Sequence, residues 1–190
     1  MRVEVTTWSL EQRSRSDLVP APEPDLQLLL MRAERPSPEL GRFLYTAVGG
    51  NWYWIDRLAW SYEQWREWLA RAGVETWVAY EAGTPAGYFE LDASSRDSVK
   101  LAYFGLFPDC MGRGIGGWLL TRALERAWDL QPERVWVHTC TLDGPNALAN
   151  YRARGMRVFA EERDVQELED RPEGPWPGAG LHGPHAVLEG

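Results

Sequence analysis

The order of hydrophobic and polar positions predicts alternating strands and helices, most clearly between residues 101 and 128. Residues 101–107 form a nearly unbroken apolar run, which is typical of a strand covered on both faces. Pro108 ends this strand because proline has no N–H to donate to a sheet. Apolar residues then recur at helical spacing between 115 and 127, with charged residues on the opposite side. The sequence therefore predicts a strand, a turn and a helix in this order.

Shorter segments on both sides are predicted by the same reasoning. Alternating or short apolar runs predict further strands over residues 2–8, 26–31, 76–80, 86–91, 134–141 and 157–162. Capping signals predict one helix from Ser37-Pro38 to Gly49, and another from the capping box Ser61 to Gln64 up to residue 73. A short helix is expected over 145–153. The mixture indicates an α/β fold.

At 190 residues, the chain is expected to form one main domain. Residues 1–24 are interpreted as an N-terminal strand followed by a proline-rich connector, and residues 25–166 as the domain itself. Residues 167–190 turn acidic and then rich in Pro and Gly, so this tail is expected to lack fixed structure.

Glycine is concentrated between the predicted strand and helix, with four glycines in residues 112–117. Each glycine inside a helix costs about 0.5–1 kcal/mol relative to alanine, so such a cluster needs a reason. A backbone without side chains lets a phosphate approach the helix N-terminus; the alternative is a tight turn with close packing. Gly112, Gly114 and Gly117 also match a dinucleotide pattern. Four residues separate them from the strand, however, and the next strand lacks the expected terminal acid.

The residues around these glycines resemble the acetyl-CoA motif of the GNAT superfamily of N-acyltransferases. That motif is Val-x-Pro followed by Gln/Arg-x-x-Gly-x-Gly/Ala. This sequence has Leu106-Phe107-Pro108 and then 111–116, MGRGIG, with Met111 in place of Gln or Arg. The resemblance implies acetyl-CoA as donor and contacts from Leu106, Phe107, Met111, Gly112, Arg113, Gly114, Ile115, Gly116 and Tyr151.

A second segment supports this resemblance. Residues 144–156, GPNALANYRARGM, are similar to the family's Asn-x-x-Ala-x-x-x-Tyr-x-x-x-Gly-Phe, with Tyr151 and Gly155 in register. Gly144 replaces the Asn and Met156 replaces the Phe. The implied fold is a mixed, mostly antiparallel central sheet flanked by helices, with the N-terminal strand as an addition.

The family normally has one more strand after the one predicted over 157–162, and the sequence shows no convincing candidate for it. A gap in a sheet would expose unpaired N–H and C=O groups. We therefore expect the N-terminal strand, from the same chain or from a neighbour, to occupy that half of the sheet. Exchange between chains would make the protein a homodimer. Residues 186–188 are a weaker alternative for the missing strand.

The resemblance implies that Tyr151 is the general acid towards the leaving thiolate; packing is its alternative role. The general base is less defined by the sequence. If the turn after Asp92 pairs this residue with Ser98, Glu90 lies opposite Lys100, which would lower the pKa of Glu90. Glu90 would then act through water, or the two residues would form only a surface ion pair. Asp56 and His138 are also candidate bases, and the reaction could run through water without a dedicated base.

An aromatic segment separates the first two predicted helices. In the GNAT fold this connection borders the acceptor site, so Trp52, Tyr53, Trp54 and Asp56 are predicted to bind the acceptor. The alternative is that the aromatic residues anchor the loop in the core.

Charge and cysteine content narrow the choice of partners. The net charge of −8 disfavours nucleic acid and anionic membranes. Two cysteines without metal-ligand spacing suggest a reducing cytoplasm, and no metal is expected. The N-terminus has no apolar signal core, and no apolar run reaches 18 residues.

We predict an N-acetyltransferase in which a primary amine of a small molecule or peptide attacks acetyl-CoA directly. The alternative is a non-catalytic acyl-CoA-binding module.

Overall fold

The computed structural model describes residues 1–169, 172 and 174, and its centre is a seven-stranded sheet in the order β2-β3-β4-β5-β6-β1-β7. All neighbouring strands are antiparallel except β5 and β6. The mixed, mostly antiparallel sheet predicted from the sequence is confirmed. The strands are β1 (Arg2–Gln12), β2 (Leu28–Arg32), β3 (Val74–Glu81), β4 (Thr84–Asp92), β5 (Ser98–Leu106), β6 (Arg134–Cys140) and β7 (Arg157–Glu167).

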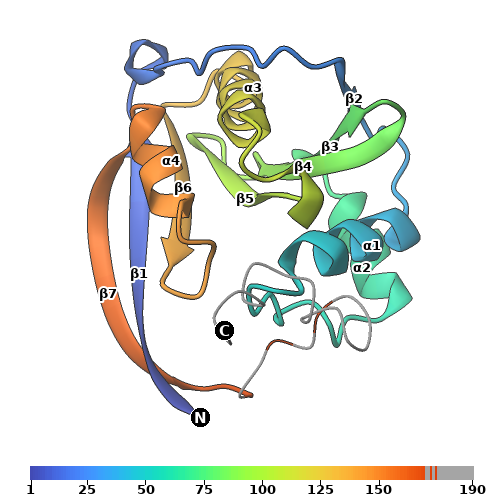
Figure 1. The fold of residues 1–190 in the computed structure, drawn as a ribbon, viewed down its shortest axis with the longest axis vertical. Coiled ribbons are helices and arrows are strands. Elements are labelled where there is room, and N and C mark those ends of the chain that lie inside the picture. Colours follow the sequence, from blue (N-terminus) through green and yellow to red (C-terminus); the bar gives the residue numbers. More distant parts are fainter. Residues whose placement is uncertain (170–171, 173, 175–190) are drawn as a thin grey trace.

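Within the described residues, four α-helices cover the two faces of the sheet (Figure 1). One face packs against α3 (Ile115–Asp129) and α4 (Ala147–Ala153), and the larger apolar core lies there. The other face packs against α1 (Pro38–Gly49), with α2 (Tyr62–Leu69) beside it, around a second cluster with Leu44, Val48 and Tyr88. Short 3-10 turns occur at Arg15–Asp17 and Pro108–Cys110. No helix in the described part of the chain is long and apolar enough to cross a membrane.

The N-terminal strand β1 lies between β6 and β7 (Figure 1). It pairs with β6 from Thr7↔Cys140 to Gln12↔Val135, and with β7 from Arg2↔Glu167 to Glu11↔Arg157. The prediction that this strand fills the second half of the sheet is confirmed, and the same chain supplies it. The alternative strand at 186–188 lies outside the described residues.

The two paired strands β1 and β7, which form a two-stranded ribbon at this end of the sheet, are both longer than predicted. β1 continues beyond residue 8 to Gln12, and β7 continues beyond residue 162 to Glu167. The charged residues of β7 gave no strand signal, but they are an exposed edge whose backbone pairs with β1. β1 and β7 therefore extend together, because the backbone N–H and C=O groups of each strand pair with those of the other.

Gln12 attaches the end of β1 to both helices on its face of the sheet. Its side chain is 1% exposed. The amide nitrogen donates to the Arg154 carbonyl at 2.8 Å, and the amide oxygen accepts from the Trp128 indole N–H at 2.8 Å. A buried amide in which both ends are hydrogen-bonded fixes where the chain leaves the sheet.

The connector after β1 then crosses the N-terminal half of α3. The Ala21 N–H donates to Thr121 Oγ1 at 2.9 Å, and Val19 exchanges hydrogen bonds with Arg154. A Cβ on Gly117 would lie 2.8 Å from Arg154 Nη1 and 3.1 Å from Ala21 Cβ. Gly117 therefore lets the connector pack closely on α3, since a Cβ there would displace the Arg154 side chain and press on Ala21. The division of the chain at residues 24 and 166 stays a prediction, and most of the predicted tail lies outside the described residues.

Candidate active site

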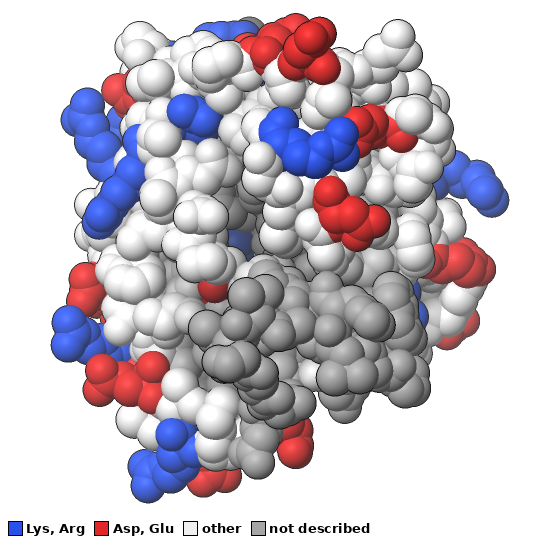
Figure 2. Space-filling view, viewed as in Figure 1, with Lys and Arg blue, Asp and Glu red and all other residues white. Residues whose placement is uncertain are grey.

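The two parallel strands at the centre of the sheet separate after a short contact. β5 and β6 pair only at Ser98↔Arg134, Val99↔Val135 and Lys100↔Trp136. Beyond Lys100, β5 continues to Leu106 paired with β4 alone. The backbone edge that β5 turns towards β6 is therefore open over its second half. Figure 2 shows this face of the molecule hollowed between the end of β5 and the area of β6 and α4, with mostly uncharged atoms around the hollow.

A β-bulge accompanies this separation. Glu90 and Leu91, adjacent on β4, pair with Tyr103 and Leu101, so Ala102 is the additional residue on β5. A bulge bends its strand and increases its twist. The bulge thus lies where β5 begins to diverge from β6.

β5 leads into the glycine-rich turn at the start of α3. Gly112 and Gly114 have φ angles of 75° and 83°, in the left-handed region where residues with a Cβ are strained. Gly114 is the N-cap of α3, but it offers no side chain to cap the helix, and the first turn holds no acidic residue. The first N–H groups of a 15-residue helix therefore face outward without a side-chain acceptor, which favours an anion there.

A cavity of about 510 Å³ lies between this turn and the connector. The residues around it come from the connector, the glycine turn and the end of α4; they are Ala21, Pro22, Glu23, Pro24, Asp25, Leu26, Arg113, Gly114, Gly117 and Arg154. The Arg113 guanidinium forms a two-point ion pair with Glu81, at 2.6 and 2.5 Å.

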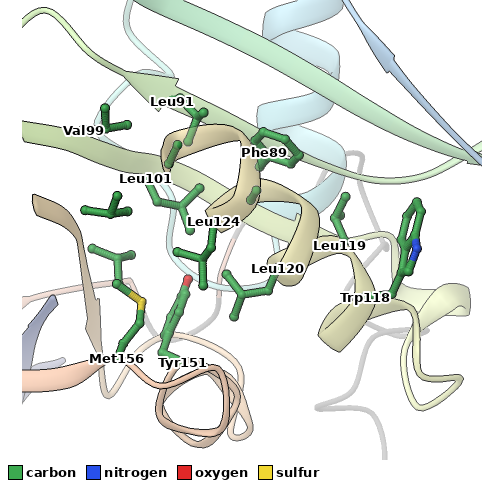
Figure 3. Packing of buried hydrophobic residues seen from close by; sticks show 14 of the residues in the cluster. Phe89, Leu91, Val99, Leu101, Trp118, Leu119, Leu120, Leu124, Tyr151 and Met156 are labelled. Atoms are coloured by element: carbon green, nitrogen blue, oxygen red, sulfur yellow. The ribbon is translucent and has the colours of Figure 1, made fainter. Parts of the chain in front are cut away.

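Tyr151 projects from α4 into the core beside the second half of β5. Its ring lies 6.1 Å from that of Phe104, and Figure 3 shows its hydroxyl directed towards the leucines of α3. The residue is 6% exposed, and its hydroxyl makes no hydrogen bond within the described part of the chain. Burial, and then the negative charge of Asp143, raise the pKa of Tyr151. Its hydroxyl therefore keeps its proton at neutral pH.

The predicted acceptor residues lie in the aromatic turn, residues 51–57, between α1 and α2. Trp54 packs against the Tyr103 ring of β5 with centroids 4.9 Å apart, and a Cβ on Gly49 would overlap its indole at 2.1 Å. Trp52 is buried, and its ring lies 3.5 Å from where a Cβ on Gly144 would be. Tyr53 donates its hydroxyl to the Glu169 carbonyl at 3.0 Å, whereas Asp56 is exposed. The turn thus contacts β5 and the loop after β6, although Trp52 and Trp54 also serve as anchors.

The expected pairing of Glu90 with Lys100 is wrong. Asp92, not Glu90, lies opposite Lys100, because the hairpin loop is longer than expected. The bulge at Ala102 then places Tyr103 opposite Glu90. Glu90 is 3% exposed and is bound by Arg57 and by the Trp68 indole. Burial raises the pKa of Glu90, although the positive charge of Arg57 opposes this effect. The Lys100 ammonium instead lies 4.9 Å from the centre of the Trp136 ring.

Comparison with known proteins now identifies the family. The family model described as the acetyltransferase (GNAT) family matches residues 39–156. This chain belongs to the GNAT acetyltransferase family. The match includes the glycine turn, Tyr151 and the aromatic turn, but not β1 and β7. Among curated proteins, none matches this GNAT chain in sequence.

Solved structures share the GNAT fold at low sequence identity. A GCN5-related N-acetyltransferase from Kribbella flavida is 16% identical with a TM-score of 0.62, covering 88% of this chain and 60% of that one. Another from Sphaerobacter thermophilus is 19% identical with a TM-score of 0.59, covering 88% and 52%. An aminoglycoside acetyltransferase from an uncultured soil metagenomic sample, in complex with trehalose, is 18% identical with a TM-score of 0.56, covering 75% and 95%. The chain thus spans about half to three fifths of the first two structures.

Sequence reasoning missed one carboxylate at this GNAT site. Asp143 follows β6, and its Oδ2 accepts hydrogen bonds from the Thr139 hydroxyl at 2.6 Å and the Cys140 N–H at 3.0 Å. Its Oδ1 lies 3.4 Å from the Trp54 indole nitrogen. An Asp directly before Gly-Pro is a turn signal that could have identified it. His138, which the sequence also offered as a base on β6, is exposed.

Proposed function

We propose that this GNAT protein transfers an acetyl group from acetyl-CoA to a primary amine of a small molecule or peptide. The observation that supports this most is the open second half of β5, which leads directly into an uncapped, glycine-rich helix start. These two features supply an extended backbone edge and a group of outward-facing N–H donors, side by side. An acyl donor with an amide-containing arm and a pyrophosphate fits both.

Different segments of the described chain are proposed to bind different parts of the donor. We assign the pyrophosphate to backbone N–H groups of 111–116, because Gly112 and Gly114 leave the approach free of side chains. The amide-containing arm would pair with the edge of β5 near Leu106 and Phe107. The cavity bordered by Arg113 and Arg154 offers space for the nucleotide end. When bound, acetyl-CoA supplies the activated acetyl group.

Tyr151 is proposed to donate a proton from its hydroxyl oxygen to the leaving sulfur. The hydroxyl keeps its proton at neutral pH, so a proton is available for transfer, whereas the raised pKa weakens it as an acid. Tyr151 also lacks a competing hydrogen-bond partner in the described chain, and a neighbouring ring on β5 restricts its side chain. Backbone N–H groups on the open edge of β5 would stabilise negative charge on the carbonyl oxygen.

The acceptor is proposed to enter beside the aromatic turn, with Trp52, Tyr53, Trp54 and Asp56 around it. This turn contacts both β5 and the loop after β6. The role of Glu90 as base stays a prediction, and water can remove the amine proton without it. Two free cysteines, Cys110 and Cys140, are consistent with a cytoplasmic protein.

A non-catalytic acyl-CoA-binding module remains the second candidate. It is favoured by Gly144, where the family often has Asn and where Trp52 occupies the adjacent space. Both candidates bind acetyl-CoA, so the deciding experiment measures turnover. We would follow release of free thiol from acetyl-CoA across a panel of amines and peptides. Amine-dependent release supports the enzyme, whereas tight binding without release from any acceptor supports the module.

A further inference from the structure

Arg57 is a buried cation enclosed by aromatic rings. It is 5% exposed, and its guanidinium carbon lies 4.3 Å from the ring centres of Trp68 and Tyr103 and 4.6 Å from that of Trp60. These rings belong to α2, to β5 and to the segment between α1 and α2. Cations are attracted to aromatic faces at such distances, and more strongly when water is excluded.

Glu90 balances this charge from β4. Its Oε1 lies 3.0 Å from Arg57 Nη2, and its Oε2 accepts from Arg57 Nη1 at 3.3 Å. The Trp68 indole N–H donates to Oε1 at 2.8 Å. Both carboxylate oxygens are therefore hydrogen-bonded, and the ion pair is buried inside the protein. Removing one member of such a pair leaves the other uncompensated.

The pair connects the aromatic turn to the two strands beneath it. The Arg57 N–H donates to the Tyr45 hydroxyl at 3.2 Å, so the backbone at the end of the turn is fixed to α1 as well. Three residues earlier, Trp54 lies on Tyr103, one of the rings around Arg57. The guanidinium and the turn thus share a support on β5, directly beyond the bulge at Ala102.

We propose that the Arg57–Glu90 pair is a positioning device that holds the turn of residues 51–57 over the open side of β5, and so sets how the acceptor amine binds. This inference rests on the proposed function. In this arrangement Glu90 acts on the acceptor through Arg57, because its carboxylate is 3% exposed and is bound by the Arg57 guanidinium and the Trp68 indole. The pair determines acceptor binding and leaves the donor site unchanged.

The test compares Glu90→Gln with Glu75→Gln in the full chain. Glu75 is a matched control because it is also buried, accepts from an indole (Trp77) and pairs with an arginine (Arg126), but it lies on the α3 face. For Glu90→Gln we expect the KM for the amine to rise about tenfold, with kcat within about twofold and the KM for acetyl-CoA unchanged. Glu75→Gln is expected to lower stability without changing the KM for the amine.

Two results would overturn the proposal. If kcat at saturating amine falls by about 100-fold and the acidic limb of the pH–rate profile disappears, Glu90 is the base. If Glu90→Gln changes only the melting temperature, as Glu75→Gln does, the pair is structural and does not position the acceptor. If Glu90→Gln does not fold, Trp68→Phe removes one hydrogen bond to Glu90 and keeps a ring beside Arg57. It should raise the amine KM in the same direction, and an unchanged KM would refute the proposal.

A second readout separates failure of this inference from failure of the proposed function. Amide hydrogen exchange is measured on the wild type, Glu90→Gln and Trp68→Phe, without substrates. We expect faster exchange in residues 51–57 of both variants, with α3 unchanged. This result can be obtained even if no amine is acetylated. Unchanged exchange in the turn would contradict the positioning role.

Discussion

Replacing Gly114 with Glu tests whether the glycine turn holds the donor. Gly114 has a φ of 83°, and a Cβ there would meet only Pro24 at 3.5 Å, an ordinary contact. The substitution therefore strains the backbone without forcing the connector away. Gly83→Glu is the matched control, because Gly83 has a φ of 82° with nothing within 4 Å, in the β3–β4 turn. The conformational cost should be about 1–2 kcal/mol in each variant.

The two variants differ in their effect on a bound pyrophosphate. A carboxylate about 5 Å from one phosphate charge costs about 1–3 kcal/mol at effective dielectric constants between roughly 80 and 20. The new side chain also covers N–H donors of the turn. We expect the affinity of Gly114→Glu for acetyl-CoA to fall at least about 100-fold, which is about 2.8 kcal/mol.

Calorimetric titration with acetyl-CoA measures this difference, and thermal melting confirms that both variants fold. The wild type and Gly83→Glu should bind alike, while both variants lose similar stability. The reasoning is refuted if folded Gly114→Glu binds acetyl-CoA within roughly threefold of the wild type. The glycines would then serve only the turn and the packing of the connector.

Three further substitutions test other parts of the account. Tyr151→Phe should leave acetyl-CoA affinity unchanged and lower turnover by about 100-fold or more. Equal turnover in the variant and the wild type would show that Tyr151 serves only in packing. Gln12→Leu should lower the free energy of unfolding, measured in urea, by about 2–4 kcal/mol, because buried partners such as the Trp128 N–H lose their hydrogen bond. An unchanged urea midpoint would show that Gln12 does not stabilise the end of β1. Burial alone would raise the pKa of Glu75, but hydrogen bonds, first from Arg126, lower it below 4.5. The stability that the Glu75 carboxylate contributes is thus fully present above its unfolded-state pKa of about 4.5. It is lost as the pH falls through the lower pKa of the folded state. Glu75→Gln should weaken this acid dependence, and a parallel pH–stability curve would contradict it.

The features that the sequence predicted well depend on short-range patterns. The apolar run of β5, the glycine turn and the amphipathic α3 are contiguous, so their periodicity and their breaks specify them locally. The place of β1 was predicted by a different argument, namely that a gap in the sheet would leave backbone groups unpaired. The unpaired backbone groups indicate where β1 lies but not how far β1 and β7 extend, because the polar residues at the ends of these strands carry no strand signal.

The parts that the sequence did not predict depend on register and on distant contacts. The bulge at Ala102 has no signature in the sequence, yet it changes the residue opposite Glu90 from Ala102 to Tyr103, beyond the shift that the longer hairpin loop already causes. The partner of Glu90 is Arg57, 33 residues earlier, on a segment whose path depends on how α1 and α2 pack. Charge complementarity alone favoured the nearer lysine. Only the folded arrangement shows that aromatic rings from α2, from β5 and from the segment between α1 and α2 enclose an arginine.

The most direct test of the central claim follows an isotopically labelled acetyl group from acetyl-CoA to an amine. The purified full chain is incubated with labelled acetyl-CoA and an acceptor from the panel, and the products are analysed by mass spectrometry. We expect labelled amide on the acceptor nitrogen, formed by the wild type and strongly reduced in Gly114→Glu and Tyr151→Phe. Label that stays in the thioester, or appears only as free acetate with every acceptor, would contradict acetyl transfer to an amine.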